Sequence, residues 1–293
     1  MSFFSGSHTI RLVLLLFVIF FLGLNMVIFG IYQLGWDGPV ARGLASGVGL
    51  PAAVVNGRFI PFQDFYERKA FAEKIEQIEG ANSQVSDGEI LSGLVKEELI
   101  LQLARENNLT VPSALLSLHR DYLLRNFAVN GSVEEELGRY DLTSEKFLEA
   151  FALPDYIKAI VAIRYLSDSS SRAATLAEGA RAELLSGQIF FTAAAAKYSD
   201  DEESKYLGGE IGFRAQTDLP PWESGTVFDL EINEISPIVV SPDGFRIFAV
   251  TARDEQSDPP RLQVRQIFFA DYSFGEFFAD YSSDQSVYIF RKL

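Results

Sequence analysis

The sequence contains no cysteine and only two histidines, His8 and His119. Without cysteine the chain has no disulfide framework, no thiolate nucleophile and no cysteine-ligated metal. Two histidines cannot build a histidine-rich zinc site, and a Ser-His-Asp triad would have to use His119, which we expect on a helix surface. Any chemistry must therefore need neither a strong nucleophile nor a metal, and we expect no cofactor.

Basic residues are scarce as well. The 293 residues include 25 Lys and Arg against 40 Asp and Glu, so the formal net charge is −15. This balance argues against nucleic acid as a partner, because phosphates are bound by Lys and Arg. It also argues against a polybasic patch for a membrane surface. The acidity instead favours solubility and weak repulsion from anionic lipid.

One long apolar run is present, from Leu12 to Tyr32, and it contains no charged residue. A bilayer core of roughly 30 Å requires about 20 apolar residues in a helix, so the run predicts a transmembrane anchor over residues 12–34. A long, cleaved signal peptide is the main alternative, although the apolar part of a signal peptide usually spans roughly 7–15 residues. A buried core helix is the other alternative, but such helices rarely stay apolar on every face.

The orientation of this anchor depends mainly on the size of the region after it. Arg11 is the strong positive charge before the span, and Arg42 lies shortly after the span. The flanking charges therefore distinguish only weakly between the two orientations of the anchor. We place residues 1–11 in the cytoplasm, because the large remainder is more easily explained as the translocated part. The bulk of the chain is then extracytoplasmic, in a periplasm or at a cell surface.

The pattern after the anchor changes twice. Residues 35–51 are rich in Gly and Ala and predict a flexible linker. Residues 52–168 are mainly helical in pattern, with a short strand first and a capping box at Ser86 and Glu89. An aromatic stripe from Phe62 to Phe71 is typical of a packed core. Residues 169–293 open with a helix, and then short strands and glycine turns dominate. The fold class is therefore α+β.

The segment from residue 180 to residue 250 contains an ordered set of short motifs. Each motif is weak alone, but the order over the whole segment resembles the parvulin family of peptidyl-prolyl cis-trans isomerases. The matching pieces are Gly187 with Phe190, Tyr198-Ser199 with Asp201, Gly208 through Phe213, Pro221 with Glu223, Val227 through Leu230, Glu234-Ile235-Ser236, and Gly244-Phe245 with Ile247.

The whole layout resembles the SurA, PpiD and PrsA group of extracytoplasmic foldases. This resemblance implies a SurA N-terminal-like helical chaperone domain at 52–168 and a parvulin-like (PpiC-type) α/β domain at 169–293. The parvulin fold begins with a histidine-bearing strand, which Ile163–Leu166 matches poorly and Val264–Phe269 matches better. We therefore expect the C-terminus to supply that strand in a permuted arrangement. A truncated second parvulin repeat is the alternative, but too few residues remain to build one.

The resemblance also implies a set of site residues. Asp201 matches the acidic position of the family pocket, and Ser241 matches a further polar position. Gln266 and Arg246 replace the two family histidines, and Arg246 is also suited to an ion pair with Asp201 or Asp243. The apolar, client-binding positions fall on Ile211, Leu219, Trp222 and Phe228, where Trp222 lies one residue before the expected aromatic position and Glu223 occupies it.

The resemblance is compatible with two functions. The first is isomerisation of X-Pro bonds in newly exported, unfolded polypeptides, a reaction whose amide barrier is roughly 18–20 kcal/mol. The second is a chaperone that keeps the parvulin shape, binds unfolded clients and has lost most of its isomerase activity. The two replaced histidines favour the second, and the ordered motifs disfavour a purely structural surface protein. The acidic residues 200–203 are as compatible with a solvated loop as with a role of Asp201 in the pocket.

Overall fold

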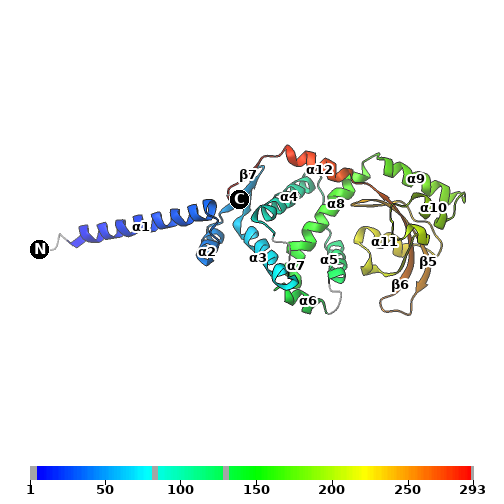
Figure 1. Cartoon of the computed structure of the whole chain (residues 1–293), viewed down its shortest axis with the longest axis horizontal. Coiled ribbons are helices and arrows are strands. Elements are labelled where there is room, and N and C mark those ends of the chain that lie inside the picture. The colour runs from blue at the N-terminus through cyan, green and yellow to red at the C-terminus, as the bar shows by residue number, and fades with distance from the viewer. Residues whose placement is uncertain (1–4, 81–84, 128–131, 292–293) are drawn as a thin grey trace. The chain divides into compact units, whose positions relative to one another are not determined.

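A computed structural model describes residues 5–80, 85–127 and 132–291. The backbone divides into two compact units, Met1–Leu99 with Asp284–Leu293, and Ile100–Ser283. Figure 1 labels helices and strands of both units. The domain boundaries expected from the sequence, including the one near residue 168, stay predictions.

The first unit begins with the long helix α1 (Ser5–Gln33). Its segment Val13–Gln33 is long and apolar enough to cross a membrane, and only 11% of it is buried. The flexible linker expected after it is wrong, because helix α2 (Pro39–Val48) forms there. Pro39 occupies the first turn, where a missing N–H costs nothing, and Gly49 ends the helix in a left-handed conformation.

A small antiparallel sheet comes after α2, with the strand order β2-β1-β7. The sheet joins segments far apart in the sequence, because β7, close to the C-terminus, pairs with β1. Helices α3 and α4 come next, and Phe62, Phe65 and Tyr66 on α3 are buried, so the predicted aromatic core is confirmed. The bounds are β1 (Pro51–Val55), β2 (Arg58–Pro61), α3 (Phe62–Glu79), α4 (Asp87–Glu106) and β7 (Val287–Ile289).

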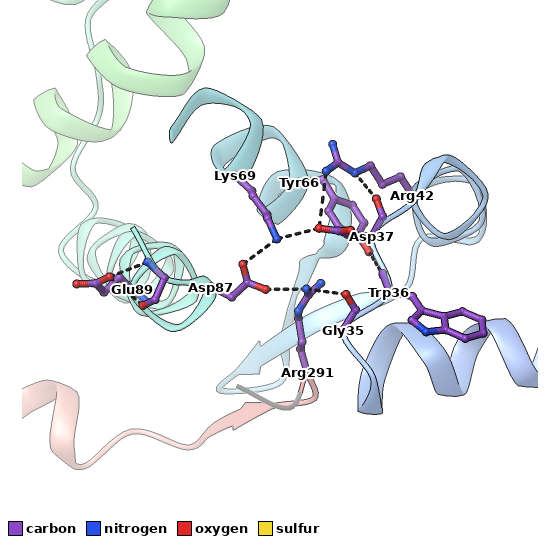
Figure 2. Close-up of polar contacts among 10 residues, drawn as sticks. Gly35, Trp36, Asp37, Arg42, Tyr66, Lys69, Asp87, Glu89 and Arg291 are labelled. Atoms are coloured by element: carbon purple, nitrogen blue, oxygen red, sulfur yellow. Dashed lines mark hydrogen bonds and ion pairs between the residues drawn. The ribbon is translucent and has the colours of Figure 1, made fainter. Parts of the chain in front are cut away.

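A network of charged side chains ties these elements together (Figure 2). Lys69 on α3 lies 2.8 Å from a carboxylate oxygen of Asp37 and 3.0 Å from one of Asp87. Arg291, just after β7, lies 2.6 Å from Asp87 and donates to the carbonyl of Gly35 at 3.2 Å. Burial alone would lower the pKa of Lys69, but its bonds to the two carboxylates outweigh burial and raise it. The network holds Arg291 against the segment immediately after α1.

The second unit continues with helices, as the mainly helical pattern of residues 52–168 predicted. Ser132 and Thr143 cap their helices by accepting backbone N–H groups, as short polar side chains do. Residues 163–166 lie inside α8 and form no strand. The helices and helical turns are α5 (Ser113–Phe127), α6 (Val133–Arg139), α7 (Ser144–Phe147), a π-helical turn (Leu148–Ala152), α8 (Leu153–Ser167), α9 (Arg172–Leu185), α10 (Phe191–Tyr198), two 3₁₀ turns (Lys205–Leu207 and Gln216–Asp218), α11 (Pro221–Asp229) and α12 (Ser273–Ser283).

The second unit also contains a four-stranded antiparallel sheet with the order β3-β6-β5-β4. Side chains alternate between its faces. Ile247 and Ile267 pack into one apolar core with residues of α9 and α10, whereas Phe248 and Val264 pack into another with residues of α11. The strands are β3 (Glu210–Ala215), β4 (Val239–Ser241), β5 (Gly244–Asp254) and β6 (Arg261–Ala270), and Figure 1 shows β5 and β6 as the long central pair.

Candidate functional site

A cavity of about 900 Å³ lies in the second unit. One side is formed by the loop after α10 and by β3, α11, β5 and β6, and the other side by α5 and α8. Six of the eight residues predicted from the sequence line this cavity: Asp201, Ile211, Leu219, Trp222, Arg246 and Gln266.

The other two predicted residues lie away from the cavity lining. Phe228 packs, partly buried, against the apolar core that contains Leu219 and Phe248. Ser241 is fully buried and donates to Glu223 Oε1 at 2.8 Å. Glu223 does line the cavity, so Ser241 touches the site through that carboxylate.

The polar side of the cavity centres on Asp201. Its Oδ2 accepts a hydrogen bond from Gln266 Nε2 at 2.8 Å and another from the hydroxyl of Ser204. Its Oδ1 accepts from the backbone N–H of Glu203 at 3.2 Å. Burial raises the pKa of Asp201, but these hydrogen bonds together outweigh burial and hold the pKa below its ordinary value. The carboxylate is therefore a fixed, ionised acceptor at neutral pH.

A glycine permits the close approach that forms this Asp201–Gln266 pair. Gly209 has a φ of +81°, and a Cβ there would lie 2.4 Å from the backbone oxygen of Gln266. The carbonyl of Gly209 also accepts the backbone N–H of Gln266 at 2.8 Å. Any larger residue at position 209 would push the loop that contains Asp201 away from β6.

Arg246 supplies a cation on the same lining. Its guanidinium donates to both carboxylate oxygens of Asp243, at 2.7 and 2.9 Å, and lies 3.5 Å from Glu223 Oε1. The guanidinium also lies 4.1 Å from the centre of the Phe268 ring. Burial alone would lower the pKa of Arg246, but its two carboxylate neighbours outweigh burial and raise it. Of the two pairings considered from the sequence, the structure shows the one with Asp243.

Glu223 is a lining residue that the predicted site set omitted. The residue is only 6% exposed, and burial raises the pKa of its carboxyl although Arg246 and Ser241 favour the charged form. The available signal was the mismatch with the parvulin motif, which placed an acid at an aromatic position. Trp222 contributes the aromatic surface on the cavity wall instead.

The expectation for His119 is wrong. The residue lies on α5, but it is fully buried and lines the cavity instead of facing solvent. The reason is that α5 packs on the rest of the site, where Arg125 forms an ion pair with Asp218. His119 Nε2 lies 2.9 Å from Asp155 Oδ2, and its ring lies 5.5 Å from the Trp222 ring. Periodicity on α5 alone gave no signal of this contact.

The comparisons with known proteins identify the segment that contains most of this site. Residues 161–252 match the family model described as "Rotamase: PPIC-type PPIASE domain". This segment is a parvulin-type domain. The chain is 32% identical to the chaperone SurA of Chromohalobacter salexigens over 104 residues, which is 34% of this chain and 24% of that protein. It is 34% identical to the SurA chaperones of Bordetella parapertussis and Bordetella bronchiseptica over 96 residues, 31% of this chain and 18% of each relative.

The matched segments thus span about a quarter or less of the length of these curated relatives. Within this chain, the parvulin-type domain contributes Asp201, Ile211, Leu219, Trp222 and Arg246 to the cavity. Gln266 on β6 and His119 on α5 come from outside residues 161–252. The arrangement places apolar side chains opposite a paired acid and a paired cation, which suits a peptide segment with an apolar ring and polar amides.

Proposed function

We propose that this chain is a membrane-anchored foldase that binds X-Pro segments of newly exported, unfolded polypeptides and catalyses their cis–trans isomerisation. The observation that carries the proposal is the cavity of the parvulin-type domain, with Ile211, Leu219 and Trp222 beside Asp201–Gln266 and Arg246. The SurA proteins that it resembles are named chaperones, which supports unfolded chains as clients.

The mechanism rests on the chemistry of the amide. Rotation about an X-Pro bond removes amide resonance, and the twisted form has less charge separation than the planar form. An apolar wall that holds the proline ring and excludes water therefore binds the twisted form better than the planar one. Leu219 and Trp222 supply that wall. Asp201 and Arg246, both held by neighbouring side chains, orient the client's amide N–H and C=O groups.

A proline-peptide isomerisation assay on the full chain in detergent tests this proposal. We expect acceleration over the uncatalysed rate and its loss when Leu219 and Trp222 are both replaced by Ala. Tyr272→Ala is the matched control, because Tyr272 is 72% exposed and does not line the cavity. A rate equal to the uncatalysed one, from a chain that folds, would contradict isomerase activity.

The second candidate is a chaperone that binds clients without isomerising them. It is favoured by the polar residues that replace the family histidines, because Gln266 is committed to Asp201 and Arg246 is committed to Asp243 and Glu223. In this case the full chain suppresses aggregation of an unfolded client without accelerating isomerisation. The Leu219 and Trp222 double substitution then abolishes suppression, whereas Tyr272→Ala leaves it unchanged.

We further propose that β6 takes the place of the first strand of the family fold. Two observations support this permutation: β6 lies between β3 and β5, and it begins at Arg261, after the matched segment ends at residue 252. A chain that ends at residue 255 then loses the sheet and its near-ultraviolet circular dichroism. If β6 is instead a remnant of a second repeat, the shortened chain keeps a folded sheet.

Membrane attachment is also part of the proposal. Helix α1 exposes apolar side chains between Val13 and Phe29, for example Phe17 at 64% and Phe20 at 67%. An anchor with residues 1–11 in the cytoplasm and the bulk outside it accounts for this exposure. Resistance to alkaline extraction together with an intact N-terminus supports an anchor, whereas a mature chain that begins after Gln33 identifies a cleaved signal sequence.

A further inference from the structure

We propose that His119 is a positioning residue that holds Trp222 in place on the wall of the client pocket. The inference rests on the proposed function for the importance of Trp222, but the contacts stand by themselves. The His119 ring lies 5.5 Å from the Trp222 ring at an interplanar angle of 39°, and 5.3 Å from the Tyr156 ring. Trp222 is half-buried and reaches the cavity, whereas His119 is fully buried against it.

An imidazole at position 119 has one unfavourable and one favourable consequence. Within the described residues, His119 Nδ1 is buried without a hydrogen-bond partner, which is unfavourable. A phenyl ring would fill the same space without that cost. What an imidazole adds is the 2.9 Å hydrogen bond from Nε2 to Asp155 Oδ2. Because an ionised carboxylate only accepts, Nε2 carries the proton, and the bond fixes the plane of the ring.

The fixed ring then restricts the indole. Asp155 lies on α8 and His119 on α5, so two helices together set one ring plane, and Trp222 on α11 packs against it. Asp155 and His119 both lie outside the segment 161–252. Helices α5 and α8, which precede most of the parvulin-type domain, therefore complete its pocket. They do so through Trp222, the aromatic residue that lies one position before the one expected from the motif.

The first test uses the fluorescence of Trp222 and needs no client. The chain has two tryptophans, so Trp36→Phe leaves Trp222 as the sole reporter. In this background we expect His119→Ala to shift the emission to longer wavelength and to lower its anisotropy, with a smaller change for His119→Phe, which keeps a ring. Leu124→Ala is the matched control, because Leu124 lies on the same helix and packs into another apolar cluster. Unchanged emission and anisotropy in His119→Ala would overturn the proposal.

The second test asks whether His119 acts through Trp222. Binding of a proline-containing peptide to the full chain is measured by calorimetry for His119→Ala, Trp222→Ala and the double variant. We expect His119→Ala to weaken binding about tenfold, or about 1.4 kcal/mol, and the double variant to bind no more weakly than Trp222→Ala alone. Asp155→Ala gives a smaller loss in the same direction.

The outcomes separate the two proposals. If the losses from His119→Ala and Trp222→Ala add in the double variant, His119 contributes independently and the positioning role is wrong. If the wild-type chain binds no peptide, the proposed function fails, and the fluorescence of Trp222 alone then decides whether His119 positions it. If His119→Ala does not fold, His119→Phe provides the same comparison, with about a threefold expected loss.

Discussion

Among the described residues, each compact unit contains a network of paired charges. In the first unit Asp37, Lys69, Asp87 and Arg291 alternate in sign and join segments that are far apart in the sequence (Figure 2). In the second unit Asp243, Arg246 and Glu223 also alternate in sign, but they border a cavity whose other lining includes Leu219 and Trp222. Pairing of charges therefore does not by itself indicate a site; the cavity beside the second network makes that network part of a candidate site.

Removal of Arg291 is expected to have the largest effect on the network of the first unit. Its side chain is 3% exposed, pairs with Asp87 and lies 4.8 Å from the Phe65 ring. Arg291→Ala leaves Asp87 paired with Lys69 and is expected to destabilise the first unit by roughly 3 kcal/mol, because the bonds of a buried guanidinium to Asp87 and to the Gly35 carbonyl are lost. Urea unfolding measures the loss. Peptide binding at the cavity of the second unit should stay unchanged, and a weakened affinity would contradict the separation of the two roles.

The converse substitution is Trp222→Ala in the second unit. Aromatic side chains at the centre of a binding surface contribute strongly, so we expect client-peptide affinity to fall about tenfold or more. The stability of the chain should change less than in Arg291→Ala, because Trp222 is only half-buried. Titration calorimetry and urea unfolding on the same preparation compare the two effects. An affinity equal to that of the wild type would show that clients bind elsewhere.

Asp201→Asn tests a smaller effect within the polar side of the cavity. An amide keeps the shape of the carboxyl but loses the charge that Gln266, Ser204 and a backbone N–H now stabilise. We expect a loss of about 1 kcal/mol in the free energy of unfolding, the usual contribution of a hydrogen bond. The loss should fade as pH falls through the lowered pKa of Asp201, because protonation removes the same charge from the wild type. An equal loss at every pH would contradict the assignment.

Much of this organisation could be predicted from the sequence, and the misses have physical causes. Local signals such as the capping box at Ser86 and Glu89 and the mainly helical pattern before residue 168 are set by neighbouring residues, and the structure has helices in that region. The helix at Pro39–Val48 was missed because its glycine content resembles a linker, whereas its stability comes from burial of Ala41 and Ala45. Composition cannot report that burial.

In the candidate site, too, local features could be predicted from the sequence and tertiary contacts could not. The parvulin-type motifs fix the spacing of residues within one segment, and Asp201, Leu219 and Arg246, which were selected from these motifs, line one cavity. They carry no information about side chains supplied by α5 and α8. His119 was therefore expected on a surface, although the packing of α5 beside α11 buries it against Trp222. Contacts between distant segments depend on tertiary packing, which periodicity along one helix does not encode.

The smallest expected effect concerns Glu223. It tests whether burial in the cavity or the ion pair with Arg246 dominates the titration of this carboxyl. Burial raises the pKa of Glu223 above its ordinary value of 4.5 despite the nearby Arg246. A carboxyl with a raised folded-state pKa contributes stability that is fully present below the unfolded pKa and is lost as pH rises through the folded pKa. Glu223→Gln removes this titration, so the stability of the variant relative to the wild type should increase as pH rises above 4.5.

Urea unfolding of both chains from acid to neutral pH measures this difference, and Glu234→Gln, an exposed acid near the same sheet, is the matched control. A relative stability of Glu223→Gln that instead falls with rising pH would mean that the pair with Arg246 outweighs burial. Glu223 would then resemble Asp87 of the first unit, a carboxylate retained for its ion pairs. The rising curve is expected because Arg246 is already bound at 2.7 Å by Asp243 and approaches Glu223 only to 3.5 Å.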